Sequence, residues 1–294
     1  MSIKIENTQV FGWEAAIRGA RNPMNSWEKS DSWFVDYWDN LDEYYGVHTI
    51  FGRHAEMQDT NEKTVGGSPL MDISWFDKDG NPYKVTVPWN DQLDSEVILG
   101  FSDHKLLMNL CKGGTEEAKW RRMVHVQMDV TAPLYWWKEF ETYKVATVSN
   151  SCSTMHKIHA KEFTLDDFSC EHLLDCDDPL ESAFDIPLIG IEFTDLYDAS
   201  GSLIQTPMDI LEHTIEMLNK CRDLFLNTKD KKYWWQMIQL LPSSYNQRRT
   251  IDLNYEVLAS QYRQRKDHKL DCWHQYCDWI KTLPLFGVYY DGGN

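Results

Sequence analysis

The chain has 294 residues, 42% of them hydrophobic and 13% aromatic, which argues against intrinsic disorder and suffices for one large domain or two small ones. The formal net charge of −17 at pH 7 would repel nucleic acid and anionic membranes, so we expect no direct binding to either. Seven cysteines without a Cys-x-x-Cys pair favour neither a disulfide framework nor a zinc ribbon, and no apolar run is long enough to span a membrane, so we expect a cytoplasmic protein.

The first third of the chain divides into three predicted parts. Residues 10–24 predict a short strand and then a helix that ends near Asn22-Pro23. Residues 30–90 are rich in β-forming runs, and Asp-Gly-Asn-Pro at 79–82 is typical of a hairpin turn. We therefore interpret residues 30–90 as an inserted β-rich module. Residues 91–119 contain clustered leucines and predict a helix, which Gly113-Gly114 ends.

The segment after this helix has the clearest pattern in the chain. Apolar residues alternate with polar ones from Val124 to Ala132, which predicts a core strand with one buried face. Pro133 ends the strand because proline has no N–H to donate, and residues 134–141 then predict a short helix. Residues 147–154 form a Ser/Thr-rich loop, whose N–H and hydroxyl groups suit an anion.

Acidic and metal-ligating residue types lie downstream of this loop. Residues 165–198 carry many carboxylates and neither Lys nor Arg, which is typical of a solvated acidic face. Cys152, His156 and His159 lack a fourth ligand and a recognisable spacing. We therefore predict no metal site.

Two apolar stripes in the last third are interrupted by cations. Pro207 opens a helix that runs to about Leu226 with Thr206 as its cap, and Arg222 interrupts the buried stripe. The same spacing predicts helix from Ile251 to Ile280, with Arg265 and Lys269 on the apolar side. A cation placed there must be paired. Each arginine is therefore either bonded to a carboxylate or available to bind a phosphate or a pyrimidine edge.

These segments together resemble the flavin-dependent thymidylate synthases. That family has a strand ending in Ala-Pro-Ile/Leu, a short helix, an Arg-His-Arg triplet and a loop that holds flavin and dUMP, and here Ala132-Pro133-Leu134 matches the strand end. The triplet falls on Thr142, Tyr143 and Lys144. In the loop, Cys152 replaces a family serine, as a nucleophile or as a small packing residue, and Thr154 replaces a phosphate-binding arginine.

The spacing of the two arginines extends the resemblance. Arg222, Leu241-Pro242 and Arg265 reproduce the family spacing between two substrate-contacting arginines without gaps, so that the resemblance covers residues 91–156 and 207–282. It implies that Arg265 is the catalytic residue that polarises the uracil ring. It further implies a deoxyuridine nucleotide site made of Arg222, Arg265, Ser149, Ser151, Cys152 and Ser153. The FAD site would comprise Tyr143, Lys144, Asn254 and Lys269, and Arg18 or Arg21 would also reach the flavin.

The resemblance implies an α/β (α+β) fold with a central antiparallel sheet flanked by helices. Residues 1–29 and 91–294 would form the core, residues 30–90 the insertion, and the whole chain a homotetramer. The implied activity is that of a nucleotide methyltransferase that moves a one-carbon unit from methylenetetrahydrofolate to dUMP with FAD. Divergent relatives of this kind resemble those of bacterial viruses. The alternative is a pseudoenzyme, a catalytically inactive acidic scaffold that binds a host protein such as a nucleic-acid-handling or defence enzyme.

Overall fold

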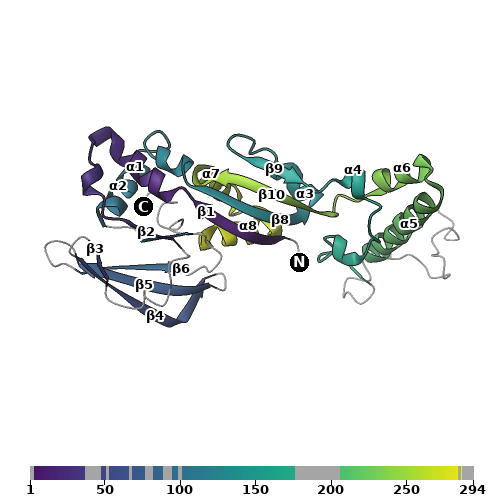
Figure 1. Cartoon of the computed structure of the whole chain (residues 1–294). Coiled ribbons are helices and arrows are strands. Elements are labelled where there is room, and N and C mark those ends of the chain that lie inside the picture. Colours follow the sequence, from purple (N-terminus) through teal and green to yellow (C-terminus); the bar gives the residue numbers. More distant parts are fainter. Residues whose placement is uncertain are drawn as a thin grey trace. The chain divides into compact units, whose positions relative to one another are not determined.

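The computed structural model describes residues 3–36, 48–50, 53–65, 68–76, 82–88, 95–98, 101–175, 206–283 and 286 (Figure 1). The chain divides into two compact units, and each is described by itself. Unit 1 comprises Met1–Lys4, Thr131–Phe140 and Ser151–Arg248. Unit 2 comprises Ile5–Val130, Glu141–Asn150 and Arg249–Asn294.

A four-stranded sheet contains the predicted core strand. Its strand order is β1 (Lys4–Phe11), β8 (His125–Pro133), β10 (Asn246–Asn254) and β9 (Val148–Ser151). Val124 directly before β8 and Val126, Met128, Val130 and Ala132 within it are buried, which confirms the predicted alternation. On the polar face, Asp129 accepts hydrogen bonds from Asn7 on β1 and Thr250 on β10, so polar side chains also link the strands.

Helices supply the rest of the core of unit 2. They are α1 (Trp13–Arg21), α2 (Phe101–Lys112), α7 (Tyr255–Arg265) and α8 (Asp271–Thr282), with the 3-10 turns η1 (Asn22–Met24), η2 (Trp27–Lys29) and η4 (Lys119–Arg122). The ring of Trp13 lies 5.3 Å from that of Tyr255 and 5.9 Å from that of Trp120. Large aromatic side chains therefore fill the space between α1, η4 and α7.

Unit 1 is built around two helices, α5 (Pro207–Thr228) and α6 (Lys231–Leu240), with the shorter α3 (Leu134–Phe140), α4 (Thr154–Lys157) and η5 (Leu165–Asp167). Thr206 caps α5 and exchanges capping-box bonds with Asp209, as its sequence position predicts. Leu211, Ile215 and Leu218 are buried in one cluster with Met237 of α6. In the part of the chain with assigned structure, no helix is long and apolar enough to cross a membrane.

Three boundaries differ from the predictions. The predicted helix over 251–280 is wrong at its start and its middle, because residues 246–254 form strand β10 and residues 266–270 separate α7 from α8. The predicted loop at 147–154 contains strand β9. The predicted helix over 91–119 is confined to Phe101–Lys112 and follows strand β7 (Ser95–Ile98).

Residues 33–98 contribute only strands among the residues with assigned structure. β2 (Trp33–Asp36) pairs with β7 in an antiparallel manner, and a second sheet has the order β3 (His48–Ile50), β4 (Arg53–Val65), β5 (Ser68–Phe76) and β6 (Pro82–Pro88). β5 and β6 are antiparallel partners, as a hairpin requires. Residues 77–81, which carry most of the predicted turn, lie outside the described residues. The domain boundaries at 29/30 and 90/91 stay predictions.

Candidate functional site

Arg265 lies at the end of α7, and its side chain is half-buried between two aromatic rings of unit 2. The guanidinium carbon lies 4.7 Å from the ring centre of Trp273 on α8 and 5.6 Å from that of Tyr143. Arg265 Nε donates a hydrogen bond to the Tyr143 hydroxyl at 2.9 Å. The two rings contact each other edge to face, with centres 6.3 Å apart. The two rings form an aromatic cage in which the guanidinium makes cation–π contacts.

The hydrogen bonds of Tyr143 continue along α7. Its hydroxyl donates to Gln264 Oε1 at 3.0 Å, and Gln264 Nε2 donates to Ser260 Oγ at 3.0 Å. The hydrogen bonds therefore form a chain with one direction. Arg265 donates to Tyr143, Tyr143 donates to Gln264, and Gln264 donates to Ser260. Such a chain polarises its members and strengthens each bond. The sequence predicts neither the hydrogen bonds of Gln264 nor the contact between Trp273 and Arg265.

The other predicted cofactor residues of unit 2 differ in their surroundings. Asn254 is 3% exposed, and its Oδ1 accepts a hydrogen bond from the Val257 N–H at 3.1 Å, so it caps α7. Lys144 and Lys269 are exposed, and so is Ser149 on β9. The cap gives Asn254 a structural role, and its predicted contact with flavin stays a prediction.

The remaining loop residues of the predicted nucleotide site belong to unit 1. The Cys152 N–H donates to the Arg248 carbonyl at 2.9 Å, and the Cys152 carbonyl accepts from Nε2 of the buried Gln247 at 2.9 Å. Ser153 Oγ accepts from the His156 N–H and caps α4. The side chains of Ser151, Cys152 and Ser153 are exposed. The loop backbone is thus fixed while its hydroxyl and thiol groups face outward.

Arg222 lies in the middle of α5, and its side chain is 19% exposed. Its Nη1 pairs with Asp223 Oδ1 at 2.9 Å, a carboxylate whose own side chain is 65% exposed. Its Nε is buried and has no hydrogen-bond partner within the described structure. Nδ1 of His159 is also buried and unbonded there, and the His159 ring packs 4.9 Å from Phe225, one turn beyond Arg222. Two unsatisfied buried nitrogens therefore lie in this part of unit 1, one on α5 and one on His159 after α4.

The arginines of the first helix have structural partners. Arg21 is 3% exposed, and its Nε donates to Asp103 Oδ1 at 2.6 Å, while Nη2 donates to Ser102 Oγ at 2.8 Å. Arg18 is exposed and pairs with Glu14 at 3.3 Å. The predicted contact of Arg18 or Arg21 with the flavin stays a prediction.

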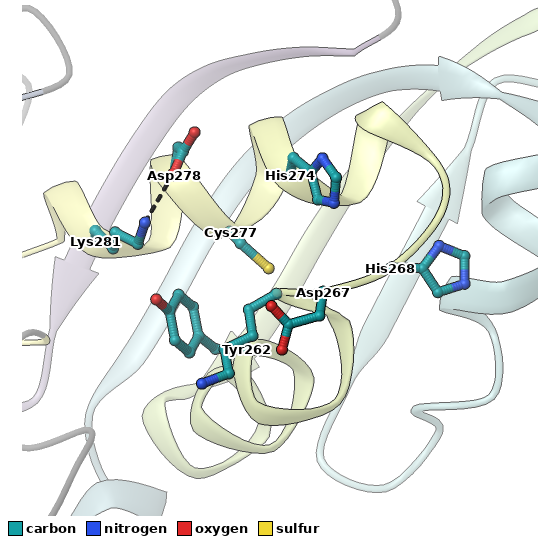
Figure 2. Close-up of a pocket in the computed structure, with 8 residues that line it drawn as sticks. Tyr262, Asp267, His268, His274, Cys277, Asp278 and Lys281 are labelled. Carbon is teal, nitrogen blue, oxygen red and sulfur yellow. Dashed lines mark hydrogen bonds and ion pairs between the residues drawn. The ribbon is translucent and has the colours of Figure 1, made fainter.

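A pocket between α7 and α8 has a volume of about 580 Å³. Figure 2 shows side chains that line it. Tyr262, Lys266, Asp267, His268, His274, Cys277, Asp278 and Lys281 line it. Lys281 Nζ and Asp278 Oδ1 lie 2.9 Å apart, and burial raises the pKa of the Cys277 thiol to about 12. The thiol is therefore neutral near pH 7 and unsuited to nucleophilic attack. Across the described residues, no three His, Cys, Asp or Glu side chains are arranged to hold a metal.

The predicted site residues therefore form two groups. Arg265, Tyr143, Lys144, Ser149, Asn254 and Lys269 belong to unit 2, and Arg222, Ser151, Cys152 and Ser153 to unit 1. Contacts unite Arg265 with Tyr143 in the first group. The assignment of these residues to a nucleotide and a cofactor stays a prediction.

No protein-family model and no curated protein matches this chain. Among solved structures, it is similar to the flavin-dependent thymidylate synthase ThyX from Helicobacter pylori complexed with FAD and dUMP, with a TM-score of 0.51, 12% identity and complete coverage of both chains. A second structure of the Helicobacter pylori protein with FAD and dUMP gives a TM-score of 0.51 and 10% identity, covering 99% of this chain and 97% of the other. These similarities confirm the predicted fold class: the chain has the fold of the flavin-dependent thymidylate synthases.

Proposed function

We propose that this protein binds a deoxyuridine nucleotide and, with FAD, transfers a one-carbon unit to it. The observation that carries the proposal is the half-buried Arg265 guanidinium, held between Trp273 and Tyr143. Solved proteins of the same fold hold FAD and dUMP, which supports the ligand class. The case for this chain rests on its own residues.

Arg265 has the chemistry that the reaction needs. A guanidinium is always protonated and presents a planar set of donors, which suits a pyrimidine carbonyl edge. Because the aromatic rings shield Arg265 from bulk water, its charge acts more strongly on a bound uracil than an exposed charge would. Polarising the ring in this way favours the addition of carbon at its C5.

In unit 1, Arg222 and the 151–153 loop carry groups that suit a phosphate. A phosphate oxygen could satisfy the buried Nε of Arg222. The exposed hydroxyls of Ser151 and Ser153 would add further donors. Thr154 stands where the family has an arginine, and a charge-assisted bond is worth about 1.5 to 3 kcal/mol. We therefore expect dUMP affinity to be weaker than in typical family members, by roughly 10- to 100-fold for each bond lost.

The residues present fit a flavin in part. Lys144 and Lys269 are exposed cations that could bind a pyrophosphate, and Asn254 is the N-cap of α7. When bound, reduced flavin supplies the hydride, and methylenetetrahydrofolate supplies the one-carbon unit. We further propose a cytoplasmic homotetramer, because the family resemblance implies sites formed between subunits. The insertion at 30–90 is proposed as a separate module.

Calorimetric titration of the purified protein with dUMP and with FAD tests the proposal. We expect saturable binding of both, a yellow protein after FAD is added, and a higher melting temperature with each ligand. Light scattering should give four times the 34.6 kDa chain mass. A colourless protein that binds neither ligand would contradict the proposal and favour the acidic scaffold, and capture of a host protein would then be the next measurement.

A further inference from the structure

Tyr143 stands where the resembled family has the histidine of its triplet, but it makes hydrogen bonds to α7 and a ring contact to α8. Its hydroxyl accepts a hydrogen bond from Arg265 Nε at 2.9 Å and donates one to Gln264 Oε1 at 3.0 Å. Both partners lie on the last turn of α7, 122 and 121 residues away in sequence. One oxygen therefore links the turn after α3 to the end of α7.

This hydrogen bond determines where the guanidinium can point. In a guanidinium the Nε–H and the outer edge of the two Nη groups face different directions, so a bond at Nε sets the direction of that outer edge. The Trp273 ring is 0% exposed and its centre lies 4.7 Å from the guanidinium carbon, so the ring limits the space in which the guanidinium can turn. Orientation of a flexible side chain before binding lowers the entropic cost of binding.

We propose that the Tyr143 hydroxyl is a positioning group, which holds the Arg265 guanidinium in the orientation that receives the pyrimidine. The inference rests on the proposed function and assigns Tyr143 to nucleotide affinity, whereas the family resemblance implies that it belongs to the FAD site. Tyr143 touches Arg265 and acts through it. Loss of the hydroxyl should therefore weaken dUMP binding and leave FAD binding intact.

The substitution Tyr143→Phe separates these two roles, because it keeps the ring and removes only the hydroxyl. We expect the dUMP dissociation constant to rise roughly tenfold, the upper part of the range for freeing one side chain. The FAD dissociation constant and the melting temperature should stay close to those of the wild type. Tyr135→Phe is the matched control: it removes another phenol hydrogen bond, to Ser169 Oγ at 2.9 Å in unit 1, and should leave dUMP affinity unchanged.

A second measurement detects the hydrogen bond between Arg265 Nε and the Tyr143 hydroxyl in the protein without ligand. In protein labelled with ¹⁵N at arginine side chains, Arg265→Lys identifies the Arg265 Nε–H signal. That signal should exchange with solvent more slowly than the Nε–H of the exposed Arg263, and Tyr143→Phe should remove the difference.

The outcomes separate the inference from the proposed function. If the wild type binds dUMP and Tyr143→Phe binds it equally well, or if the variant weakens FAD binding instead, the positioning role is overturned while nucleotide binding stands. If the wild type binds no dUMP, the proposed function fails and the inference fails with it. Loss of dUMP affinity together with loss of Nε–H protection supports the inference.

Discussion

The carboxylate of Asp103 is the best-connected buried charge of the described structure, and its removal gives a sharp stability prediction. Asp103 is 0% exposed, and its Oδ1 accepts from Arg21 Nε at 2.6 Å. Its Oδ2 accepts from the Ser30 and Ser32 hydroxyls and from the Asp31 and Ser32 N–H groups at 2.6 to 3.1 Å. The substitution Asp103→Asn keeps the shape but removes the charge and turns one acceptor into a donor.

The magnitude follows from these contacts. Whichever way the new amide points, its NH₂ faces groups that also donate, and the buried Arg21 loses its counter-charge. Loss of one partner of a buried ion pair costs about 3 to 5 kcal/mol. We therefore expect Asp103→Asn to lower the free energy of unfolding by about 3 to 5 kcal/mol, a large share of the stability of an ordinary domain.

Urea unfolding measures this change, with the slope of the transition as a check that the same surface unfolds. Glu14→Gln is the control, since it breaks a pair whose side chains are 62% and 71% exposed and should change stability by no more than about 0.5 kcal/mol. Equal effects of the two substitutions would refute the reasoning. If Asp103→Asn instead lowered FAD affinity and left stability unchanged, the result would support the flavin contact of Arg21 that the family resemblance implies.

Three further predictions test other parts of the molecule. Thr206→Ala removes the capping box of α5 and should cost about 1 kcal/mol in urea unfolding; an unchanged midpoint would contradict the cap. Leu218→Ala, at a side chain with 0% exposure in unit 1, should cost about 2 to 5 kcal/mol, whereas Leu240→Ala at 44% exposure should cost far less. Alkylation at pH 8, followed by mass spectrometry, should label the exposed Cys152 and spare Cys277, whose thiolate stays a very small fraction until the pH approaches its pKa of about 12; early labelling of Cys277 would contradict its burial.

Local patterns account for the parts of the fold that were predictable. The alternation from Val124 to Ala132 reports one buried face of a strand, and the Thr206-Pro207 pair marks the start of α5. Both signals depend only on neighbouring residues.

The predicted helix wrongly began at Ile251, because residues there match both the helical spacing of four and the strand spacing of two. Ile251 and Tyr255 are four residues apart, as on a helix, but Ile251 and Leu253 are both 0% exposed, as on a strand. Asn254 caps α7, and an asparagine at that place was the available sign of a strand-to-helix change.

For the candidate site at Arg265, the sequence predicted only that cationic side chains would lie on a buried helix face. An arginine that interrupts an apolar stripe is visible in the sequence, and Arg265 is indeed half-buried. Its bond to Tyr143 joins residues 122 positions apart, and no local pattern in a single sequence encodes such a contact. The replacement of the family triplet by Thr142, Tyr143 and Lys144 indicated a changed flavin site, but it gave no sign that the tyrosine would bond an arginine.

The most direct test of nucleotide binding at Arg265 is a dUMP titration of two variants of the same helix. Arg265→Ala removes the caged guanidinium, and Arg263→Ala removes an exposed one two residues earlier, with the same change of charge. We predict that Arg265→Ala abolishes measurable dUMP binding while its melting temperature without ligand stays near that of Arg263→Ala. Equal dUMP affinity in the two variants would contradict the proposed site.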